Sequence, residues 1–347
     1  MEATQDFNNE RYRIPDNTDA FFLGLLSVYI FLVGVPGNTL ILLAVLFSRK
    51  LQTTSNAFIV NLAIADLFAC LVQPLHMVGT WANYYSSSLD SMCLVASCIS
   101  HLCIACSIFT LAAIAFNRFV LVVCSSSTYQ SIYRSKFLKI WIPLLWTLAV
   151  LMTLLPPLAL DIGKFGFDNN THTCRSIIDY PTADQYDSII VFGVYPLPFF
   201  IIIVCYSGIL LTVIKHDRRL KKRKTEMSVI SSDDPIQRSA TVLTKTITKQ
   251  LSVTSMEIRV TANMFIIFCA FIVCTTPLFI CTIYQCLIMP YVRTVLAINS
   301  TLNPLIYGVN HPIFRSVFTS FLKCKPVPEP SNFLIGLRRR IYALRES

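Results

Sequence analysis

Seven long apolar stretches dominate this chain, and they limit the folds that it can adopt. We place them at residues 20–47, 55–82, 91–124, 137–160, 187–214, 257–288 and 292–309. About 20 apolar residues suffice for a helix to cross a bilayer, and backbone groups in lipid must pair within their own segment. The pattern therefore predicts an all-α membrane protein built as a seven-transmembrane helix bundle.

Nearly every stretch carries a polar or helix-breaking residue deep inside it. These residues are Asn38, Asp66, Arg118, Trp146, Pro198, Pro277 and the run Asn303-Pro304-Leu305-Ile306-Tyr307. An ionisable group inside a membrane is unfavourable by several kcal/mol and rarely persists without a function. Such residues on successive helices predict a polar mechanism buried in the bundle.

Composition and charge support this assignment. Of the 347 residues, 54% are hydrophobic and only 14% are charged, which excludes an ordinary soluble domain. If the N-terminus is outside, most of the 29 Lys and Arg residues fall in the inner loops and tail. This positive-inside pattern orients the bundle in the plasma membrane as a multi-pass protein. No nucleic-acid partner is expected, because the net charge of +10 does not form a basic face on a folded domain.

One transmembrane domain accounts for most of the chain. We expect an extracellular arm (1–19), the helix bundle (20–310) with a long basic third inner loop (216–255), an interfacial helix (311–324) and a cytoplasmic tail (325–347). The interfacial helix follows the break at His311-Pro312, where apolar residues recur at helical spacing with basic residues opposite. Cys324 directly after it is a candidate palmitoylation site; a free thiol is the alternative.

Two features belong to the outer surface. Cys93 begins the third helix there, and Cys174 lies in the second outer loop. Because that compartment is oxidising, we expect a disulfide between them. Asn169 begins an Asn-Asn-Thr acceptor pattern in the same loop and is a candidate for glycosylation.

A carboxylate stands in the middle of the second helix. Asp66 needs hydrogen-bond partners, a counter-ion or a proton. Ser107, Asn299, Ser300 and Asn303 supply oxygens and amides from other helices. Such a set could hold a small cation, with Na⁺ the natural candidate; a hydrogen-bonded or protonated Asp66 is the alternative.

The inner helix ends carry a second pair of charges. Arg118 ends the third helix, and Glu257 stands at the inner start of the sixth. Their pairing would hold the two helices together and would break when the helices separate, as a two-state switch requires. Pro198 and Pro277 lack an amide hydrogen and weaken the fifth and sixth helices, so the inner ends can swing.

The order and spacing of these motifs are similar to those of rhodopsin-like (class A) G-protein-coupled receptors, over all seven helices. The triplet Asn117-Arg118-Phe119 loosely resembles the Asn-Arg-Tyr of the melatonin-receptor-like group. The resemblance implies a receptor that converts an extracellular ligand into activation of a heterotrimeric G protein. Arrestin and a receptor kinase are further candidate partners, and no enzymatic activity is expected.

The resemblance also implies roles for individual residues. Arg118 would contact the G protein, with Tyr206 and Tyr307 supporting the open state. Pro304 belongs to the matching seventh-helix motif. Ile108, Pro198 and Phe271 match a packing trio that links the ligand pocket to the inner half. The sodium ligands would be Asp66, Ser107, Asn299 and Ser300, with Asn303 alongside.

The sequence departs from the family pattern at two places. The sixth-helix motif usually reads Cys-Trp-x-Pro, but here it is Cys274-Thr275-Thr276-Pro277. Without the tryptophan, the usual trigger is in doubt and Phe271 is expected to take its part. Asn117 replaces an acid beside Arg118, so restraint falls mainly on Glu257, and we expect raised basal activity.

The ligand pocket should lie between the third, fifth, sixth and seventh helices. An amine ligand is disfavoured because Ser100 occupies the position of the usual carboxylate. Retinal is not expected because Ala297 stands where a Schiff-base lysine is needed. Candidate lining residues are His76, Ser100, His101, Ile104, Phe279 and Arg293.

Arg293 could meet a ligand carboxylate, although a lipid phosphate or an outer-loop acid would satisfy it equally. The histidines are alternatively plain core residues. Short outer segments favour a small molecule, a lipid or a short peptide over a large protein hormone. A transporter or channel is the rival class, but internal repeats and discontinuous helices typical of transporters are not evident in the sequence.

Overall fold

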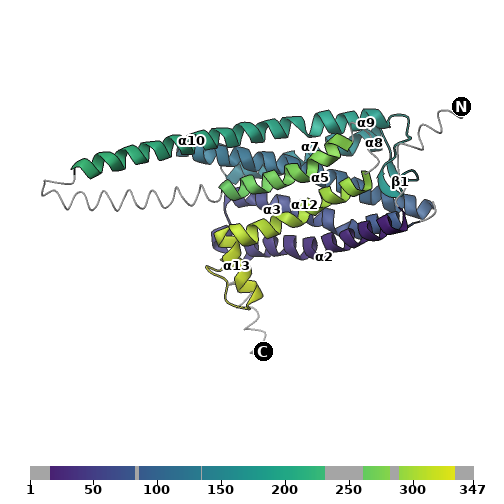
Figure 1. The fold of residues 1–347 in the computed structure, drawn as a ribbon, viewed down its shortest axis with the longest axis horizontal. Coiled ribbons are helices and arrows are strands. Elements are labelled where there is room, and N and C mark those ends of the chain that lie inside the picture. Colours follow the sequence, from purple (N-terminus) through teal and green to yellow (C-terminus); the bar gives the residue numbers. More distant parts are fainter. Residues whose placement is uncertain (1–15, 83–85, 134, 231–260, 282–288, 333–347) are drawn as a thin grey trace.

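The computed structural model describes residues 16–82, 86–133, 135–230, 261–281 and 289–332. Most of its helices run side by side along the long axis of the molecule (Figure 1). The long elements are α2 (Asn17–Phe47), α3 (Thr54–Leu71), α4 (Gln73–Trp81), α5 (Ser87–Val123), α7 (Ser135–Thr153), α10 (Pro196–Ile230), the helix Thr261–Cys281 and α12 (Met289–Asn310).

Five spans in the described part are long and apolar enough to cross a membrane. They are Asn17–Phe47, Thr54–Trp81, Ser87–Val123, Ala183–Lys215 and Thr261–Cys281. The fourth span is α7, continued by the short α8 (Leu155–Ala159), and the seventh is α12. Together they form the predicted seven-helix bundle.

Three of the spans contain breaks whose exact positions were not predicted from the sequence. The second span divides at Val72 into α3 and α4, because Pro74 has no amide hydrogen to continue the helical ladder. The fourth divides at Leu154, just before Pro156 and Pro157. The fifth consists of α9 (Ala183–Ile189), a π-helical turn, η2 (Ile190–Val194), and α10. π-Turns of this kind are frequent at functional sites.

The inner end of the fifth span continues as a helix beyond residue 214, into the basic segment. α10 continues to Ile230, well past residue 214, so the basic segment that follows Lys215 is helical rather than a loop from its start. Figure 1 shows this extension projecting beyond the other helices. The rest of the third inner loop (231–255) lies outside the described residues.

A small hairpin closes the outer end. β1 (Phe165–Asp168) pairs antiparallel with β2 (Thr173–Ser176), and Phe167 lies opposite Cys174. Cys174 forms the disulfide with Cys93 near the start of α5. The hairpin therefore has a fixed position over the outer mouth of the bundle.

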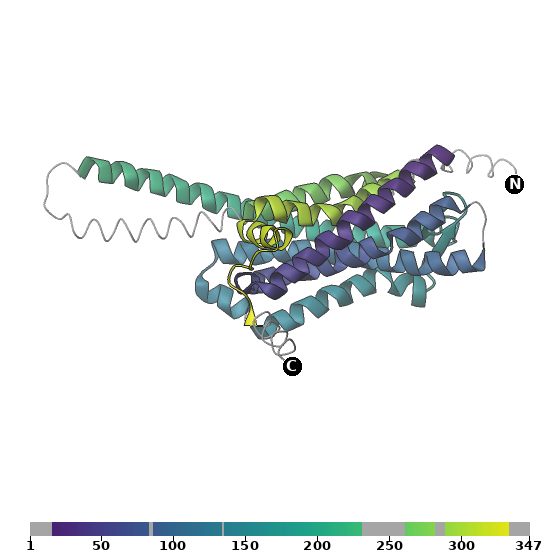
Figure 2. The same cartoon turned by 90° about the horizontal axis from the view of Figure 1, so that it is seen from below.

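The inner end carries η1 (Arg49–Leu51), α6 (Ser126–Ile132) and the amphipathic α13 (Pro312–Leu322). α13 turns away from the direction of α12 at the break expected at His311 (Figures 1 and 2). Its Phe314 and Val317 are buried, whereas Leu322 is exposed, as suits a helix lying at a membrane surface.

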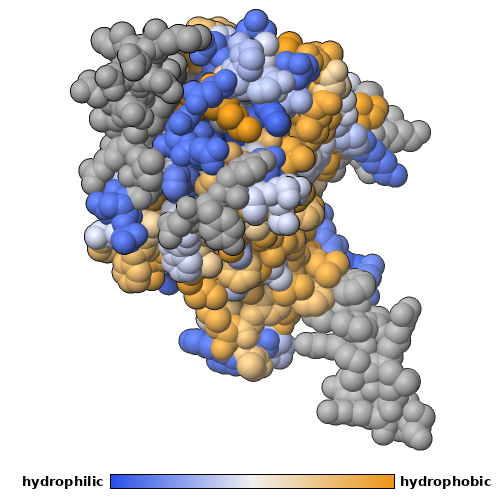
Figure 3. Space-filling model, turned by 90° about the vertical axis from the view of Figure 1, so that its right-hand side faces the viewer, coloured by the Kyte–Doolittle hydropathy of each residue, from blue (hydrophilic) through white to orange (hydrophobic). Residues whose placement is uncertain are grey.

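The surface has the distribution of a membrane protein. Large apolar side chains on α2 and α10 are exposed, among them Leu32, Leu197 and Phe200. Figure 3 looks onto the outer end, where polar residues gather, while apolar residues cover the flanks. The buried core clusters along α3, α5 and α10.

Candidate ligand pocket and polar core

One cavity of about 140 Å³ lies inside the outer half of the bundle. Its wall comes from helices α2 to α5, the strand β2, the fifth span, the helix Thr261–Cys281 and α12. All six residues expected to line a ligand pocket do line it: His76, Ser100, His101, Ile104, Phe279 and Arg293. The cavity also reaches inward to Asp66, Asn299 and Ser300.

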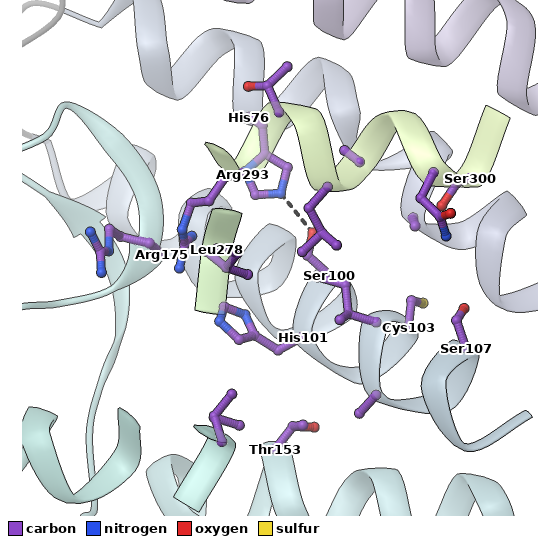
Figure 4. Close-up of a pocket in the computed structure, with 18 of the residues that line it drawn as sticks. His76, Ser100, His101, Cys103, Ser107, Thr153, Arg175, Leu278, Arg293 and Ser300 are labelled. Carbon is purple, nitrogen blue, oxygen red and sulfur yellow. Dashed lines mark hydrogen bonds between the residues drawn. The ribbon is translucent and has the colours of Figure 1, made fainter. Parts of the chain in front are cut away.

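The two histidines of the pocket have partners within the protein. His76 Nε2 lies 2.8 Å from Ser100 Oγ, the contact drawn in Figure 4. His101 Nδ1 lies 2.8 Å from the carbonyl oxygen of Ser97, one turn earlier on α5. The His101 ring also packs on Phe165 of β1, with the ring centroids 4.7 Å apart.

Two arginines stand at the outer end of the cavity. Arg293 Nη1 donates to the carbonyl oxygen of Cys174 over 3.4 Å. Arg175, the next residue on β2, donates from Nε to the carbonyl oxygen of Ser176 (3.0 Å). Arg293 Nε and Arg175 Nη1 are buried and have no hydrogen-bond partner in the described protein.

Asp66 forms a compact polar cluster at the inner end of the cavity. Its side chain is buried, and its Oδ1 accepts hydrogen bonds from Ser300 Oγ (3.0 Å) and Ser107 Oγ (3.4 Å). Its Oδ2 accepts one from Asn303 Nδ2 (2.6 Å). The side-chain oxygens of Asn299 and Asn303 are buried without hydrogen-bond partners in the described part. Oxygen atoms of this kind are the ligands that hard cations prefer.

The apolar layer beneath the pocket contains the expected trio. Ile108 and Phe271 are buried, and Pro198 is buried at the start of α10. Phe199, next to Pro198, packs edge-on against Phe271, with the ring centroids 6.4 Å apart. Thr275, at the usual tryptophan position, donates to the carbonyl oxygen of Phe271 over 2.6 Å.

At the inner end, Arg118 is buried within α5. Its neighbour Asn117 accepts a hydrogen bond from Ser55 Oγ on α3 (2.7 Å), which also lies 3.3 Å from Tyr129 Oη on α6. Ser55 therefore connects α3 to α5 through Asn117 and to α6 through Tyr129. The expected partner Glu257 lies outside the described residues.

Two tyrosines expected in the switch lie near the helix Thr261–Cys281. Tyr307 Oη donates to Met264 Sδ over 3.6 Å. The Tyr206 ring stacks on Phe268, with the ring centroids 6.1 Å apart. Pro304 lies inside α12, one turn from Tyr307. Both tyrosine side chains are buried.

Comparison with known proteins decides the family. Residues 37–307 match the sequence profile of the 7 transmembrane receptor (rhodopsin family). The chain belongs to this receptor family. The squid rhodopsin crystal structure, 21% identical, has the same fold, with a TM-score of 0.71 over 92% of this chain and 90% of that one.

The receptor is also similar to curated family members. It is 28% identical to the human melatonin receptor type 1B over 84% of this chain and 75% of that protein. It is 24% identical to the G-protein coupled receptor moody of Drosophila melanogaster, over 88% of this chain but only 52% of moody, about half its length.

These findings confirm several predictions from the sequence. The chain is a class A G-protein-coupled receptor near the melatonin receptors, a multi-pass protein of the plasma membrane. The transporter alternative is not supported, because the relatives are receptors.

Several lining residues of the cavity were not predicted from the sequence, among them Arg175, Tyr186 and Asp187. These three residues come from the outer hairpin and α9, where helical periodicity does not indicate which side chains point toward the cavity. The one usable signal was adjacency, since Arg175 directly follows the cysteine that the disulfide holds over the pocket.

Proposed function

We propose that occupancy of the outer cavity shifts the inner helix ends between two arrangements and so activates a heterotrimeric G protein. One observation carries the proposal: the same cavity is lined by Arg293 and His76 at its outer end and by Asp66 at its inner end. A ligand bound there acts on the polar core through contiguous space. Differential affinity for the two arrangements then shifts their populations.

We propose an allosteric sodium site at Asp66. The donor set fits, because a buried carboxylate is surrounded by neutral hydroxyl and amide groups, and two amide oxygens lack partners. The ion would be held by Asp66, Ser107, Asn299 and Ser300, with Asn303 beside them. Bound sodium supplies the positive charge that a buried carboxylate otherwise lacks.

The inner residues have roles in coupling under this proposal. Arg118 contacts the G-protein α-subunit when the sixth helix moves outward, and Glu257 restrains it in the closed state. Tyr206 and Tyr307 turn inward to support the open state. Pro198, Pro277 and Pro304 weaken their helices locally, which allows the bending that the transition needs.

Modification and regulatory partners complete the proposal. Asn169 is exposed in the turn between β1 and β2, where a glycan can attach. Cys324 is exposed directly after α13, as palmitoylation at the inner leaflet requires. A receptor kinase and arrestin would act on the third inner loop, whose Ser231 and Ser232 lie outside the described residues. We assign no enzymatic activity and no retinal.

The direct test is guanine-nucleotide exchange on purified heterotrimers, by full-length receptor in nanodiscs. We expect measurable basal exchange, a rise in Glu257→Ala, and loss in Arg118→Gln. Lys164→Gln, which changes an exposed outer lysine, serves as the matched control and should leave exchange unchanged. No exchange on any of several α-subunits, or no rise in Glu257→Ala, contradicts the proposal.

A further inference from the structure

We infer that the receptor recognises a small ligand by an anionic head group, a carboxylate or a phosphate, held between Arg175 and Arg293. The inference rests on the proposed function, since it assumes that the outer cavity is the ligand site. It adds the chemical class of the ligand and a residue, Arg175, that the sequence pattern did not indicate.

The fold brings the two arginines together from distant parts of the chain. Arg293 projects from the outer end of α12, and Arg175 lies on β2, which the disulfide at Cys174 fixes over the cavity. Arg293 donates to the carbonyl oxygen of Cys174, the residue immediately before Arg175. Figure 4 shows both side chains at the same end of the pocket. Both side chains are thus held by regular structure, Arg293 by α12 and Arg175 by β2.

Both guanidinium groups keep buried donors without acceptors. Arg175 is only 3% exposed, yet its Nη1 has no hydrogen-bond partner, and the same holds for Arg293 Nε within the described structure. Buried donors are nearly always satisfied in folded proteins, so an unpaired pair at one cavity wall needs an acceptor. A carboxylate or phosphate matches the planar fork of arginine and accepts from both groups.

The nearby acids leave this acceptor position open. Asp168 lies 3.9 Å from Arg175 Nε, but its Oδ2 also accepts from Thr171 Oγ1 (2.8 Å), and the residue does not line the cavity. Asp187 on α9 does line the outer part, as the one carboxylate among the described lining residues there. Asp168 partly balances the charge of Arg175, but neither Asp168 nor Asp187 accepts a hydrogen bond from Arg293 Nε or Arg175 Nη1 in the described structure.

The rest of the cavity wall describes the body of the ligand. Ile104, Val191, Phe279 and Leu296 make much of it apolar. The inner end holds Asp66, which would repel a second acid. These walls select a molecule with one acidic head and an apolar or aromatic body. A neutral ligand such as melatonin, which the names of several relatives indicate for those proteins, would leave both arginines unsatisfied.

The experiment measures ligand-induced thermal stabilisation of the full-length receptor in nanodiscs. The probes are the phenylalkanoic acids from phenylacetate to phenylhexanoate, their primary amides, the matching phenylalkyl phosphates, and melatonin. We expect at least one acid or phosphate to stabilise the receptor and to bind about 10-fold or more tightly than its amide. The acid and phosphate arms distinguish the two head groups.

Variants assign the effect to the two side chains. Arg175→Gln and Arg293→Gln should each weaken binding of the best anion about 10-fold or more, and leave binding of its amide nearly unchanged. Arg175→Lys keeps the charge without the fork and should recover part of the affinity. Lys164→Gln removes an exposed outer positive charge away from the cavity and is the control for long-range electrostatics. Two independent arginine sites keep the test valid if one variant fails to fold.

Equal stabilisation by acids and amides, or no stabilisation by any anion, overturns the inference, as does anion binding that survives both glutamine variants. The outcome is separate from that of nucleotide exchange. Receptor that binds anions through both arginines but fails to activate any α-subunit would refute the proposed function and leave the ligand class standing as the chemistry of this cavity.

Discussion

At the scale of single residues, the polar core is a charge surrounded by neutral donors. Asp66 receives three hydrogen bonds, from Ser107, Ser300 and Asn303. These bonds hold the carboxylate in place but do not neutralise it, and a buried unneutralised charge is strongly unfavourable. The buried amide oxygen of Asn299 lacks a partner in the same cluster. A cation satisfies both groups together.

Replacing Asp66 therefore should remove the response of the receptor to sodium. The midpoint of thermal unfolding of wild type should be higher in NaCl than in N-methylglucamine chloride of equal ionic strength. At ten times the dissociation constant, the ion adds about 1.4 kcal/mol to stability. Asp66→Asn should abolish this increment. The control Asp187→Asn removes the other carboxylate that lines the cavity, and this variant should keep the sodium-dependent increase in the unfolding midpoint. An unchanged increase in Asp66→Asn would argue against a sodium site at Asp66.

The polar core and the part of the pocket wall that lies on long helices were predictable from the sequence, whereas the part that comes from the outer hairpin and α9 was not. Asp66, Ser107 and Ser300 lie on long apolar helices, where a polar residue must face the interior. Arg175 and Asp187 lie in a hairpin and a short helix, whose facing depends on the register and the disulfide. No periodic pattern in the sequence indicates which of these side chains point toward the cavity.

At the scale of elements, α13 is capped at its N-terminus by His311, the residue that joins it to α12. His311 Nδ1 accepts from the amide of Phe314 at 3.5 Å and so caps the helix. Burial, followed by the positive charge of Arg118, lowers the pKa of His311 to about 4. The folded receptor therefore favours the neutral imidazole of His311, because only the neutral ring can accept this hydrogen bond.

Acidification should loosen α13. Since the folded pKa lies below the unfolded value of about 6.5, the stabilisation is complete above that pH and is lost as pH falls toward 4. His311→Asn keeps a capping oxygen that does not titrate, so its α13 should be less sensitive to pH. The cap contributes about 0.5–2 kcal/mol. Amide hydrogen exchange of residues 312–322 measures the opening of α13. An equal pH dependence of this exchange in wild type and in His311→Asn would refute the role of His311.

A second element, the tail segment 327–332, folds back onto the first inner loop. Ser331 donates from its amide to Phe47 (2.8 Å) and from its hydroxyl to Leu46 (2.7 Å), both at carbonyl oxygens. Glu329 accepts from the Arg49 amide and pairs with Lys50 Nζ at 2.7 Å. Ser331 is 1% exposed, whereas the ion pair is at the surface.

We predict that Ser331→Asp releases this segment, because the change buries a carboxylate against the carbonyl oxygen of Leu46. Amide exchange of 327–332 should rise to the rate of an open chain. Lys50→Ala is the matched control on the same contact; an exposed ion pair contributes about 0–1 kcal/mol, so exchange should change little. Retained protection in Ser331→Asp would show that the segment is held by other contacts.

Element boundaries show where sequence reasoning was limited. The span 55–82 was placed well, but its division at Val72 was not predicted, although Pro74 carried the signal. The π-turn Ile190–Val194 precedes Pro196 and Pro198, which indicated a weak point but not its form. Which hydrogen bond a helix gives up before a proline depends on the packing of its neighbours.

At the scale of the whole molecule, the bundle connects the outer cavity to the inner helix ends that we propose as the switch. Hydrophobic length and the positive-inside pattern sufficed to predict seven spans and their orientation, because the bilayer imposes both. Three buried residues, Ile108, Pro198 and Phe271, lie between the two ends. Thr275 stands at the usual tryptophan position and bonds to the carbonyl oxygen of Phe271, and Asp66 lines the same cavity as the outer residues.

The most direct test measures the distance between the inner ends of α5 and the helix Thr261–Cys281. Nitroxide labels at Val123→Cys and Ala262→Cys, both exposed positions, report it by double electron–electron resonance once exposed Cys269 and Cys324 are serine. In receptor alone, we predict mainly one short distance between the two labels. When the stabilising anion and a nucleotide-free heterotrimer are added, we predict that a longer distance appears and that the population of the short distance falls. A single unchanged distance under all conditions would contradict the account.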